Sequence, residues 1–328
     1  MFDLIIYYLS TILRVHFINY FQVELLVFTI LDLKNDLIPA FGNARIIQLN
    51  LKRLNKYYAR LVAEGRGVRT VRLIHSVLHS ALQHACQIGL ISRNPCHGAI
   101  LPRYPSKEMK ILKEDQVLIF LLAVATSHYR LIYKLALVTG MRQSELLGLK
   151  WEDIDWEKSA ISVKRQAQYV NGMGIIFIEP KTRAGIRKIA LGNSILDDLR
   201  KHKIEQEKIK LLRKNQWTEH KLIFSTSNGT PISQRNLTRD FLKVIRKTEL
   251  PRIRFHDLRH TAASLMINRG IPVVVVSKLL GHSKPSVTLN IYAHCVSEYQ
   301  YEAARVMEEI ATPIAFELEE IPQDSENY

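Results

Sequence analysis

Cysteine is scarce in this sequence, which contains only Cys86, Cys96 and Cys295. No two of them have the Cys-x-x-Cys spacing of a zinc site, and their spacing does not suggest a disulfide framework. Isolated cysteines of this kind are typical of proteins that work in a reducing compartment. We therefore expect neither a disulfide-stabilised secreted domain nor a structural zinc site.

A long uninterrupted hydrophobic run is also missing. The first thirty residues are apolar and aromatic, but six polar or charged side chains break them: Asp3, Arg14, His16, Asn19, Gln22 and Glu24. A membrane-spanning helix needs about 20 apolar residues with almost no charge, and a signal peptide needs a positively charged start. Residues 1–30 are therefore interpreted as a poorly specified buried helix or an unusual start, with a membrane anchor as the alternative.

Acidic residues are too few to balance the basic ones. The 328 residues include 46 Lys and Arg but only 31 Asp and Glu, which gives a net charge of +15 and a pI of about 9.7. An excess of this size indicates a polyanionic partner, with nucleic acid ahead of an anionic membrane, unless the charge serves solubility alone. The length and the hydrophobic content of 47% are typical of two globular domains.

The charge is unevenly distributed along the chain. Residues 45–110 contain twelve Lys or Arg and two Asp or Glu, whereas residues 296–328 contain one Arg and nine Asp or Glu. The basic front half and the acidic tail should therefore meet different partners. We expect the front half to face phosphate and the tail to pack on protein or to remain in solvent.

Apolar residues at helical spacing predict two helices in the front half, at 51–62 and 71–85. Their other faces are basic, and the candidate DNA contacts are Lys52, Arg53, Lys56, Arg60, Arg66, Arg69 and Arg72. Solvated faces of this kind are common, but charges of a single sign favour a nucleic-acid contact. We expect a helical DNA-binding domain over residues 31–105, a larger domain over 106–300 and an acidic tail over 301–328.

The second half is predicted to be mainly α-helical with a small antiparallel β-sheet. Helices are expected at 117–125, 129–138, from 144 onward, and at 196–212, 233–245, 255–268, 273–280 and 286–292, and strands at 161–163, 175–178 and 188–191. Gly172 and Gly174 should lie in the turn between the first two strands. The third strand should pair with the second across residues 183–185, which places Lys181 at the start of a hairpin turn.

The densest group of chemically useful residues is at 254–262. His256 and Arg259 are three residues apart and should share a helix face. His256 and His260 have the spacing of a zinc-protease helix, but Asp257 stands where that motif needs a glutamate, and no third ligand is evident. A metal site is therefore not expected, and an ordinary helix surface is the plain alternative.

Four further residues could take part in the same chemistry. Arg142 follows Gly140 in a tight turn that opens a helix, where unpaired N–H groups favour an anion, although an ion pair with Glu145 would also explain it. His282 follows Gly281 at a helix end, and Tyr292 comes ten residues later. The fourth residue is Lys181, at the start of the expected hairpin turn. Taken singly, Lys181 could be an ordinary exposed turn lysine and Tyr292 an ordinary packed aromatic.

Taken together and in this order, these residues resemble the active site of the tyrosine recombinases, the phage integrase family. The resemblance rests on the segments 139–149, 255–261 and 279–294 and covers about residues 31–300. It implies a two-domain clamp around duplex DNA and a site made of Arg142, Lys181, His256, Arg259, His282 and Tyr292.

The resemblance also implies a reaction without cofactor or ATP, and the residue chemistry agrees with it. Arg142 and Arg259 would bind the non-bridging phosphate oxygens, as planar guanidinium groups do well. Tyr292 would attack the phosphate with His256 as base, and the product would be a 3′-phosphotyrosyl bond and a free 5′-hydroxyl. His282 would donate a hydrogen bond to the phosphate and Lys181 a proton to the leaving group.

By the same resemblance, a homotetramer would act on two double-stranded DNA attachment sites, integrating or excising a mobile element in the cytoplasm, at the nucleoid. An accessory DNA-bending or directionality factor could take part, and no membrane is implied. The acidic tail would pack on a neighbouring protomer or fold back on its own domain. The alternatives are a type IB topoisomerase, distinguished by relaxation without site preference, and an inactive DNA-binding relic.

Two features depart from the family pattern. The family often has a polar residue where this chain has Gly185. Residues 1–30 resemble neither the polar first helix of the DNA-clamping domain nor the separate arm-binding domain that many relatives carry. The first clamp helix is therefore expected to be missing or altered.

Overall fold

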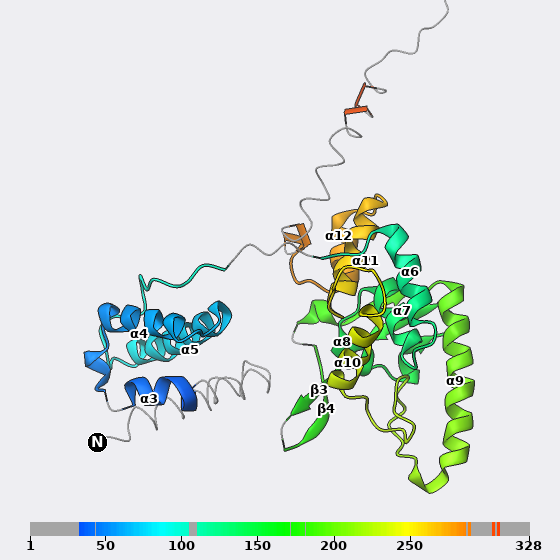
Figure 1. Ribbon diagram of the computed structural model, residues 1–328, viewed down its shortest axis with the longest axis horizontal. Helices are drawn as coiled ribbons and strands as arrows, with labels where there is room; N and C mark the ends of the chain where they lie inside the picture. Colours follow the sequence, from blue (N-terminus) through cyan, green and yellow to red (C-terminus); the bar gives the residue numbers. More distant parts are fainter. Residues whose placement is uncertain are drawn as a thin grey trace, which may run out of the picture. The chain divides into compact units, whose positions relative to one another are not determined.

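The computed structural model describes residues 33–42, 44–104, 110–170, 172–180, 182–286, 288–289, 304–305 and 307–308. The predictions for residues 1–30, for Lys181, for Tyr292 and for most of the acidic tail lie outside the described residues. The described chain forms two compact units (Figure 1). The first is a helical unit within residues 33–104, with which residues 169–174 are grouped, and the larger unit contains residues 110–168 and the chain from residue 175 onward.

The first unit is built around two helices, α4 (Leu51–Ala63) and α5 (Val68–Gln87), preceded by the short elements η1 (Leu33–Leu37), α3 (Ile38–Phe41) and η2 (Ile46–Gln48). The Asn50 side chain caps α4 by accepting a hydrogen bond from the backbone N–H of Arg53 at 3.0 Å. Leu54 and Tyr58 of α4 and Ile74 of α5 are almost fully buried. The two helices predicted in this part of the sequence are therefore confirmed.

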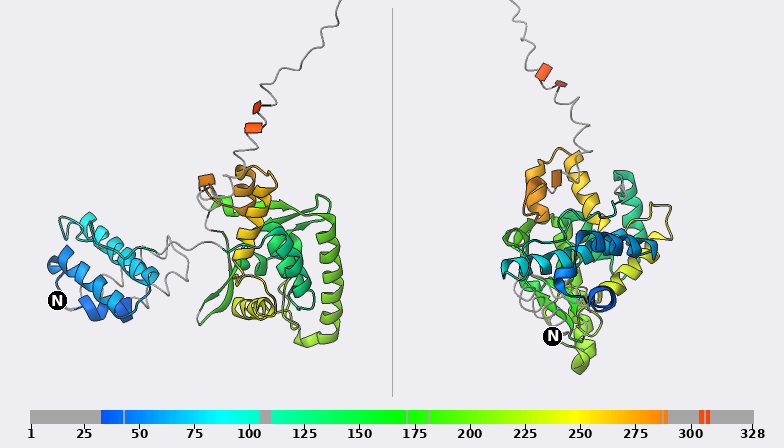
Figure 2. Two further views of the ribbon diagram at one scale, coloured as in Figure 1. Left: turned by 45° about the horizontal axis from the view of Figure 1, so that its top comes forward. Right: turned by 90° about the vertical axis from the view of Figure 1, so that its left-hand side faces the viewer.

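The larger unit contains α6 (Glu114–Val124), α7 (Arg130–Thr139), α8 (Gln143–Leu147), α9 (Asn193–Arg213), α10 (Gln234–Ile245), α11 (Asp257–Asn268) and α12 (Val273–Leu280). Each was predicted to within a few residues. In it α11 packs against α7 and α12, and α9 runs along one edge, as both Figure 1 and Figure 2 show. The core is rich in aromatic rings, with Phe120, Tyr133 and Phe241 fully buried and in contact.

The sheet differs from the prediction in its pairing. Strands β1 (Ile154–Asp155), β2 (Ala160–Val163) and β5 (Arg187–Ala190) form one antiparallel sheet in the order β1-β2-β5, with Ile161 opposite Ile189. Strand β4 (Gly174–Ile178) pairs instead with β3 (Gln166–Val170), which was not predicted. The expected hairpin between 175–178 and 188–191 is therefore wrong.

The physical reason for the observed pairing is burial. Ile161, Val163 and Ile189 are all buried in the core of the larger unit, and the β2–β5 register brings them onto one face. The turn that contains Gly172 and Gly174 joins β3 to β4, and both glycines have a positive φ. Residues 179–186 therefore connect two separate sheets. No helix among the described residues is long and apolar enough to span a membrane.

Candidate active site

Arg259 lies at the meeting point of three helices. Its side chain projects from the first turn of α11, and the residue is only 3% exposed. Nη1 donates to the carbonyl of Gly140 at 2.8 Å and Nη2 to the carbonyl of Leu280 at 2.6 Å. Both carbonyls stand at helix C-termini, which carry partial negative charge and otherwise lack intrahelical partners. These two bonds fix the plane of the buried guanidinium.

Gly140 is required by this arrangement for two reasons. It ends α7 in the left-handed conformation, with φ +63°, which disfavours a side chain. A Cβ atom there would also lie 2.6 Å from Cδ2 of Leu280, so that buried side chain would have to move. The packing next to Arg259 therefore favours glycine at this residue.

Arg142 lies two residues further on, at the N-cap of α8, and is held by the buried carboxylate of Glu145. The backbone N–H of Arg142 donates to Glu145 at 3.0 Å, and its Nη1 donates to the same carboxylate at 2.7 Å. Arg187 of β5 donates to the carboxylate at 2.9 Å. Two arginines therefore share one carboxylate, and the ion pair considered as an alternative for Arg142 exists within the site.

The ionisation of Glu145 follows from these partners. Burial alone would raise the pKa of its carboxyl group, but the hydrogen bond and charge of Arg187, together with the charge of Arg142, lower the pKa below its ordinary value. The carboxylate therefore remains ionised at neutral pH. One negative charge then faces two guanidinium groups, and this part of the site keeps a net positive charge.

His282 follows Gly281, the left-handed C-cap of α12, and its Nδ1 is 2.7 Å from the Thr288 hydroxyl. Burial first, and then the positive charges of Arg259 and Arg142, lower the pKa of His282 to about 4. The side chain is therefore neutral at pH 7. Arg259 is bonded to the carbonyl of Leu280, two residues before His282, and to that of Gly140, two residues before Arg142. The structure therefore brings these three predicted residues together.

His256 stands at the N-cap of α11, and its ring meets that of His260 edge to face with the centroids 5.0 Å apart. The residue as a whole is exposed. Partial desolvation of the ring, and then the neighbouring His260 and Arg259, lower the pKa of His256, so that it too is neutral at pH 7. Among the described residues no three His, Cys, Asp or Glu side chains are placed to hold a metal ion.

Lys181 and Tyr292, the other two predicted site residues, lie outside the described residues. The turn that follows Lys181 is described, and it lies next to the end of α12. A Cβ atom on Gly281 would be 2.8 Å from the carbonyl oxygen of Ala184. Gly185, where the family often has a polar residue, is buried, and a Cβ there would be 2.5 Å from Cβ of Pro180.

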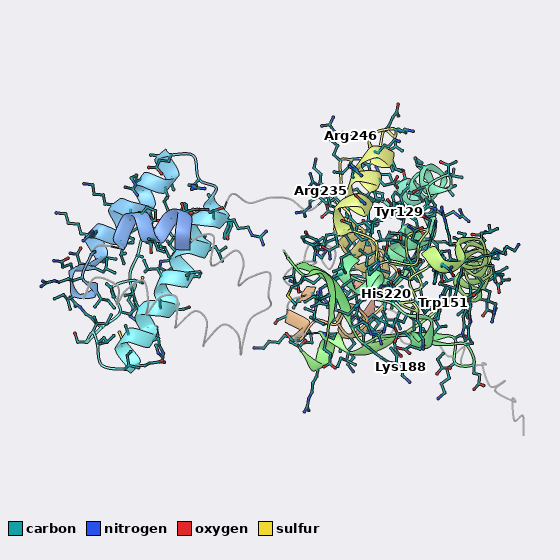
Figure 3. The ribbon with its side chains drawn as sticks, turned by 90° about the horizontal axis from the view of Figure 1, so that it is seen from below. Tyr129, Trp151, Lys188, His220, Arg235 and Arg246 are labelled. Carbon is teal, nitrogen blue, oxygen red and sulfur yellow. The ribbon has the colours of Figure 1, made fainter. Side chains whose placement is uncertain are left out.

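Arg187 was not predicted as a site residue, and His260 was considered only as a possible metal ligand. Arg187 could have been found from the alternation of β5, in which Arg187 and Ile189 share the inner face while Lys188 is exposed. In Figure 3 Lys188 lies at the outer edge of the larger unit. The ion partner of Arg187, Glu145, is 42 residues away in sequence, and no local pattern predicts that contact.

The basic candidates of the first unit differ in their surroundings. Six are exposed: Lys52, Arg53, Lys56, Arg60, Arg66 and Arg69. Of these, Arg53 lies over the ring of Phe41, and Arg60 lies over the ring of Tyr57 and pairs with Glu64. Arg66 donates to the buried carboxylate of Asp36 at 2.8 Å, and Arg72 donates to the carbonyl of Pro102 at 2.9 Å and lies over the ring of Tyr104. Arg66 and Arg72 therefore have structural partners within the first unit.

The chain is similar to known integrases and recombinases. The model of the phage integrase family matches residues 110–298. A tyrosine recombinase XerC-like protein of Caldanaerobacter subterraneus subsp. tengcongensis is 30% identical over 274 residues, which cover 78% of this chain and 70% of the relative. The ICEBs1 integrase of Bacillus subtilis strain 168 is 24% identical, covering 82% of this chain and 73% of that protein.

Solved structures show the same fold. The Tn1549 transposon integrase in complex with transposon right-end DNA matches with a TM-score of 0.69 and 24% identity, covering 82% of this chain and 88% of the integrase. A lambda integrase tetramer bound to a Holliday junction matches with a TM-score of 0.61 and 21% identity, covering 87% of this chain and 76% of that integrase.

Proposed function

Because the chain belongs to the phage integrase family, we propose that it is a site-specific recombinase that cuts and rejoins DNA through a covalent bond between a phosphate and Tyr292. The observation that carries this proposal is the group of Arg259, Arg142 and His282, which three different helix ends bring into one positive field. The relatives are integrases and recombinases by name, which does not favour the topoisomerase alternative.

The two arginines bind the scissile phosphate in this proposal. In-line attack on a phosphodiester builds negative charge on the non-bridging oxygens, and cations placed before the reaction stabilise that charge most effectively. Arg259 is fixed by two carbonyls and Arg142 by Glu145, so neither has to be ordered when DNA binds. This preorganisation supports a transition-state role for both groups.

The histidines and Tyr292 would move the protons. A tyrosine hydroxyl with an ordinary pKa of about 10 must lose its proton as it attacks, and a neutral histidine can accept it. The lowered pKa of His256 keeps it unprotonated and able to act as base. His282, also neutral, would donate a hydrogen bond to a phosphate oxygen through its remaining ring nitrogen.

Lys181 would protonate the departing 5′-hydroxyl in this scheme. The turn that follows Lys181 packs next to the C-terminal end of α12, because Ala184 lies against Gly281. Within that turn, Pro180 lies against Gly185. The products are a 3′-phosphotyrosyl bond and a free 5′-hydroxyl. One ester replaces another, so rejoining by the reverse reaction needs no ATP.

The remaining assignments follow from the family. We assign residues 31–105 to a DNA-binding domain and residues 106–300 to the catalytic domain, with double-stranded attachment sites as the substrate. The lambda integrase was solved as a tetramer on a Holliday junction, and we propose a homotetramer on two sites here. An accessory DNA-bending or directionality factor fits this scheme, as does action in the cytoplasm at the nucleoid.

Covalent trapping tests the proposal. The full chain is incubated in EDTA with a nicked suicide duplex carrying the ends of the element and then run on a denaturing gel. We expect a protein–DNA adduct that Tyr292→Phe cannot form. If no adduct appears on a duplex that the protein demonstrably binds, the chain is an inactive DNA-binding relic and the proposal is wrong.

A further inference from the structure

One buried arginine, Arg187, contacts three segments that carry or adjoin proposed catalytic residues. It begins β5, and its side chain is only 6% exposed. The guanidinium stays charged inside proteins, and burying it costs free energy unless its donors are well paired. The partners that Arg187 makes therefore explain how the fold accommodates a charge at this position.

The first partner is Glu145. Arg187 approaches the carboxylate with two nitrogens, Nη2 at 2.9 Å and Nη1 at 3.3 Å. The same carboxylate receives the backbone N–H and the Nη1 of Arg142. Arg187 therefore decides how much of the Glu145 charge is available to Arg142. Without Arg187, the carboxylate would bind Arg142 alone and compete with a phosphate for it.

The other partners are two backbone carbonyls. Nε of Arg187 donates to the carbonyl of Leu279 at 2.5 Å, and Nη1 donates to that of Gly185 at 3.1 Å. Leu279 precedes Leu280, whose carbonyl binds Arg259, and lies three residues before His282. Gly185 ends the turn η4 (Arg183–Gly185) that follows Lys181. A single side chain thus ties β5 to both of these segments.

The packing around Gly281 adds an independent observation. A Cβ atom there would lie 2.9 Å from Nη1 of Arg187 and 2.8 Å from the carbonyl of Ala184. The C-terminal end of α12 therefore packs directly against both Arg187 and the 183–185 turn. Arg187 is also among the charges that lower the pKa of His282.

We propose that Arg187 is a positioning residue for strand cleavage, which fixes Glu145, the end of α12 and the 183–185 turn relative to one another. It acts through these neighbours, so that Arg142, Arg259 and His282 meet the phosphate together. The inference rests on the proposed function and deepens it. It predicts an effect on the reaction rate that is separate from DNA affinity and from stability.

The test compares Arg187→Met and Arg187→Lys with the unchanged full chain. Single-turnover adduct formation is measured on the nicked suicide duplex at saturating DNA, alongside DNA affinity by fluorescence anisotropy and thermal unfolding. We expect Arg187→Met to slow cleavage about 10²-fold, the order of loss that misplaced catalytic groups cause. DNA affinity should stay within about threefold, because Arg187 itself makes no contact with DNA in this scheme. Arg187→Lys should recover part of the rate, since it keeps the charge but not the planar fork.

Arg165→Met is the matched control. The Arg165 side chain is 17% exposed and forms an ion pair with Asp153, whose side chain is 1% exposed, in the same unit. Removing it should lower thermal stability as Arg187→Met does, while cleavage by the folded fraction remains. The inference is overturned if Arg187→Met cleaves within about threefold of the unchanged chain, or no more slowly than Arg165→Met at equal thermal stability.

Two outcomes separate the possible failures. If Arg187→Met does not fold, Arg187→Lys is judged by the same comparison of rate, affinity and stability, and an unchanged rate overturns the inference. If the unchanged chain forms no Tyr292-dependent adduct, the proposed function fails before Arg187 is tested.

Discussion

The two units of this protein use basic side chains in opposite ways. In the first unit Lys52, Lys56 and Arg69 are exposed on helices whose other faces form the core. In the larger unit Arg259 is 3% exposed and the Arg187 side chain 6%, and each is bonded to backbone carbonyls. The same charge is hydrated in one of these two sets of residues and immobilised in the other, although the larger unit also has exposed basic side chains such as Lys188.

The difference separates two physical tasks. Exposed cations on long side chains attract a polyanion without fixed geometry, and salt weakens that attraction. Buried cations with fixed partners act only on a group placed next to them, and they lose little freedom when it arrives. Position in the sequence does not decide which of these two tasks a basic residue has. Arg66 and Arg72 both lie in the basic front half, yet both have structural partners.

The largest effect is expected where a buried cation is removed. Arg259→Ala should lower cleavage by about 10³-fold, because it deletes a preorganised donor to the transition state. DNA affinity should change little, since the exposed cations of the first unit supply most of it in this scheme. The measurement is single-turnover adduct formation beside anisotropy. A variant that cleaves normally would remove Arg259 from the site and erase the contrast between the two units.

A smaller effect is expected when exposed cations are removed. Lys52→Ala with Lys56→Ala should reduce the slope of log affinity against log salt concentration by about 2, because each lysine would neutralise one phosphate. Cleavage at saturating DNA should stay near normal. The affinity is measured by anisotropy between low and moderate salt.

Arg66→Ala is the matched comparison for that pair. It removes a positive charge from the same unit, but one that is bonded to the buried Asp36. We expect it to lower the free energy of unfolding by about 1 kcal/mol, a value discounted because the arginine is half exposed, and to leave the salt slope nearly unchanged. An unchanged slope for the lysine pair would instead remove Lys52 and Lys56 from the DNA interface.

A separate effect is a pH dependence of stability. The pKa of His282 is about 4 in the folded protein against an ordinary 6.5, so the unfolded chain binds more protons between these values. Stability should therefore fall as the pH drops from 6.5 towards 4. His282→Gln should flatten this dependence, most clearly between about pH 5 and 6.5, where carboxylates are ionised in both states. Thermal unfolding across that window measures it, and an unaltered profile would contradict the pKa of His282.

Sequence alone predicted the helices well and the sheet poorly. The helix at 273–280 has the predicted bounds, because four valines, two leucines and a following glycine define it locally. Pairing between strands depends on which faces are buried together, and β5 joins β2 across an intervening hairpin. Strand β3 escaped notice because Gln166 and Gln168 interrupt its apolar pattern, although Gln168 is buried.

The site was predicted as a set of residues but not as an arrangement. Arg142, His256, Arg259 and His282 were identified from motifs, and the structure places them around the ends of α7, α8, α11 and α12. The hydrogen bonds that hold this region together join distant segments, as Arg187 does with Glu145 and Leu279. Such bonds form only when distant segments fold together, so the spacing of residues within one segment does not predict them.

The bonds of Arg259 also bear on how a cell tolerates an enzyme that transfers DNA strands. They join residues 119 and 21 positions apart, so the cutting centre does not exist in any short stretch of the chain. A nascent chain still on the ribosome, or a product truncated before Leu280, already has the basic first unit and Arg142 but lacks a carbonyl that orients Arg259. On the proposed function, such a fragment would hold DNA without nicking it, and strand breakage would wait for complete synthesis and folding.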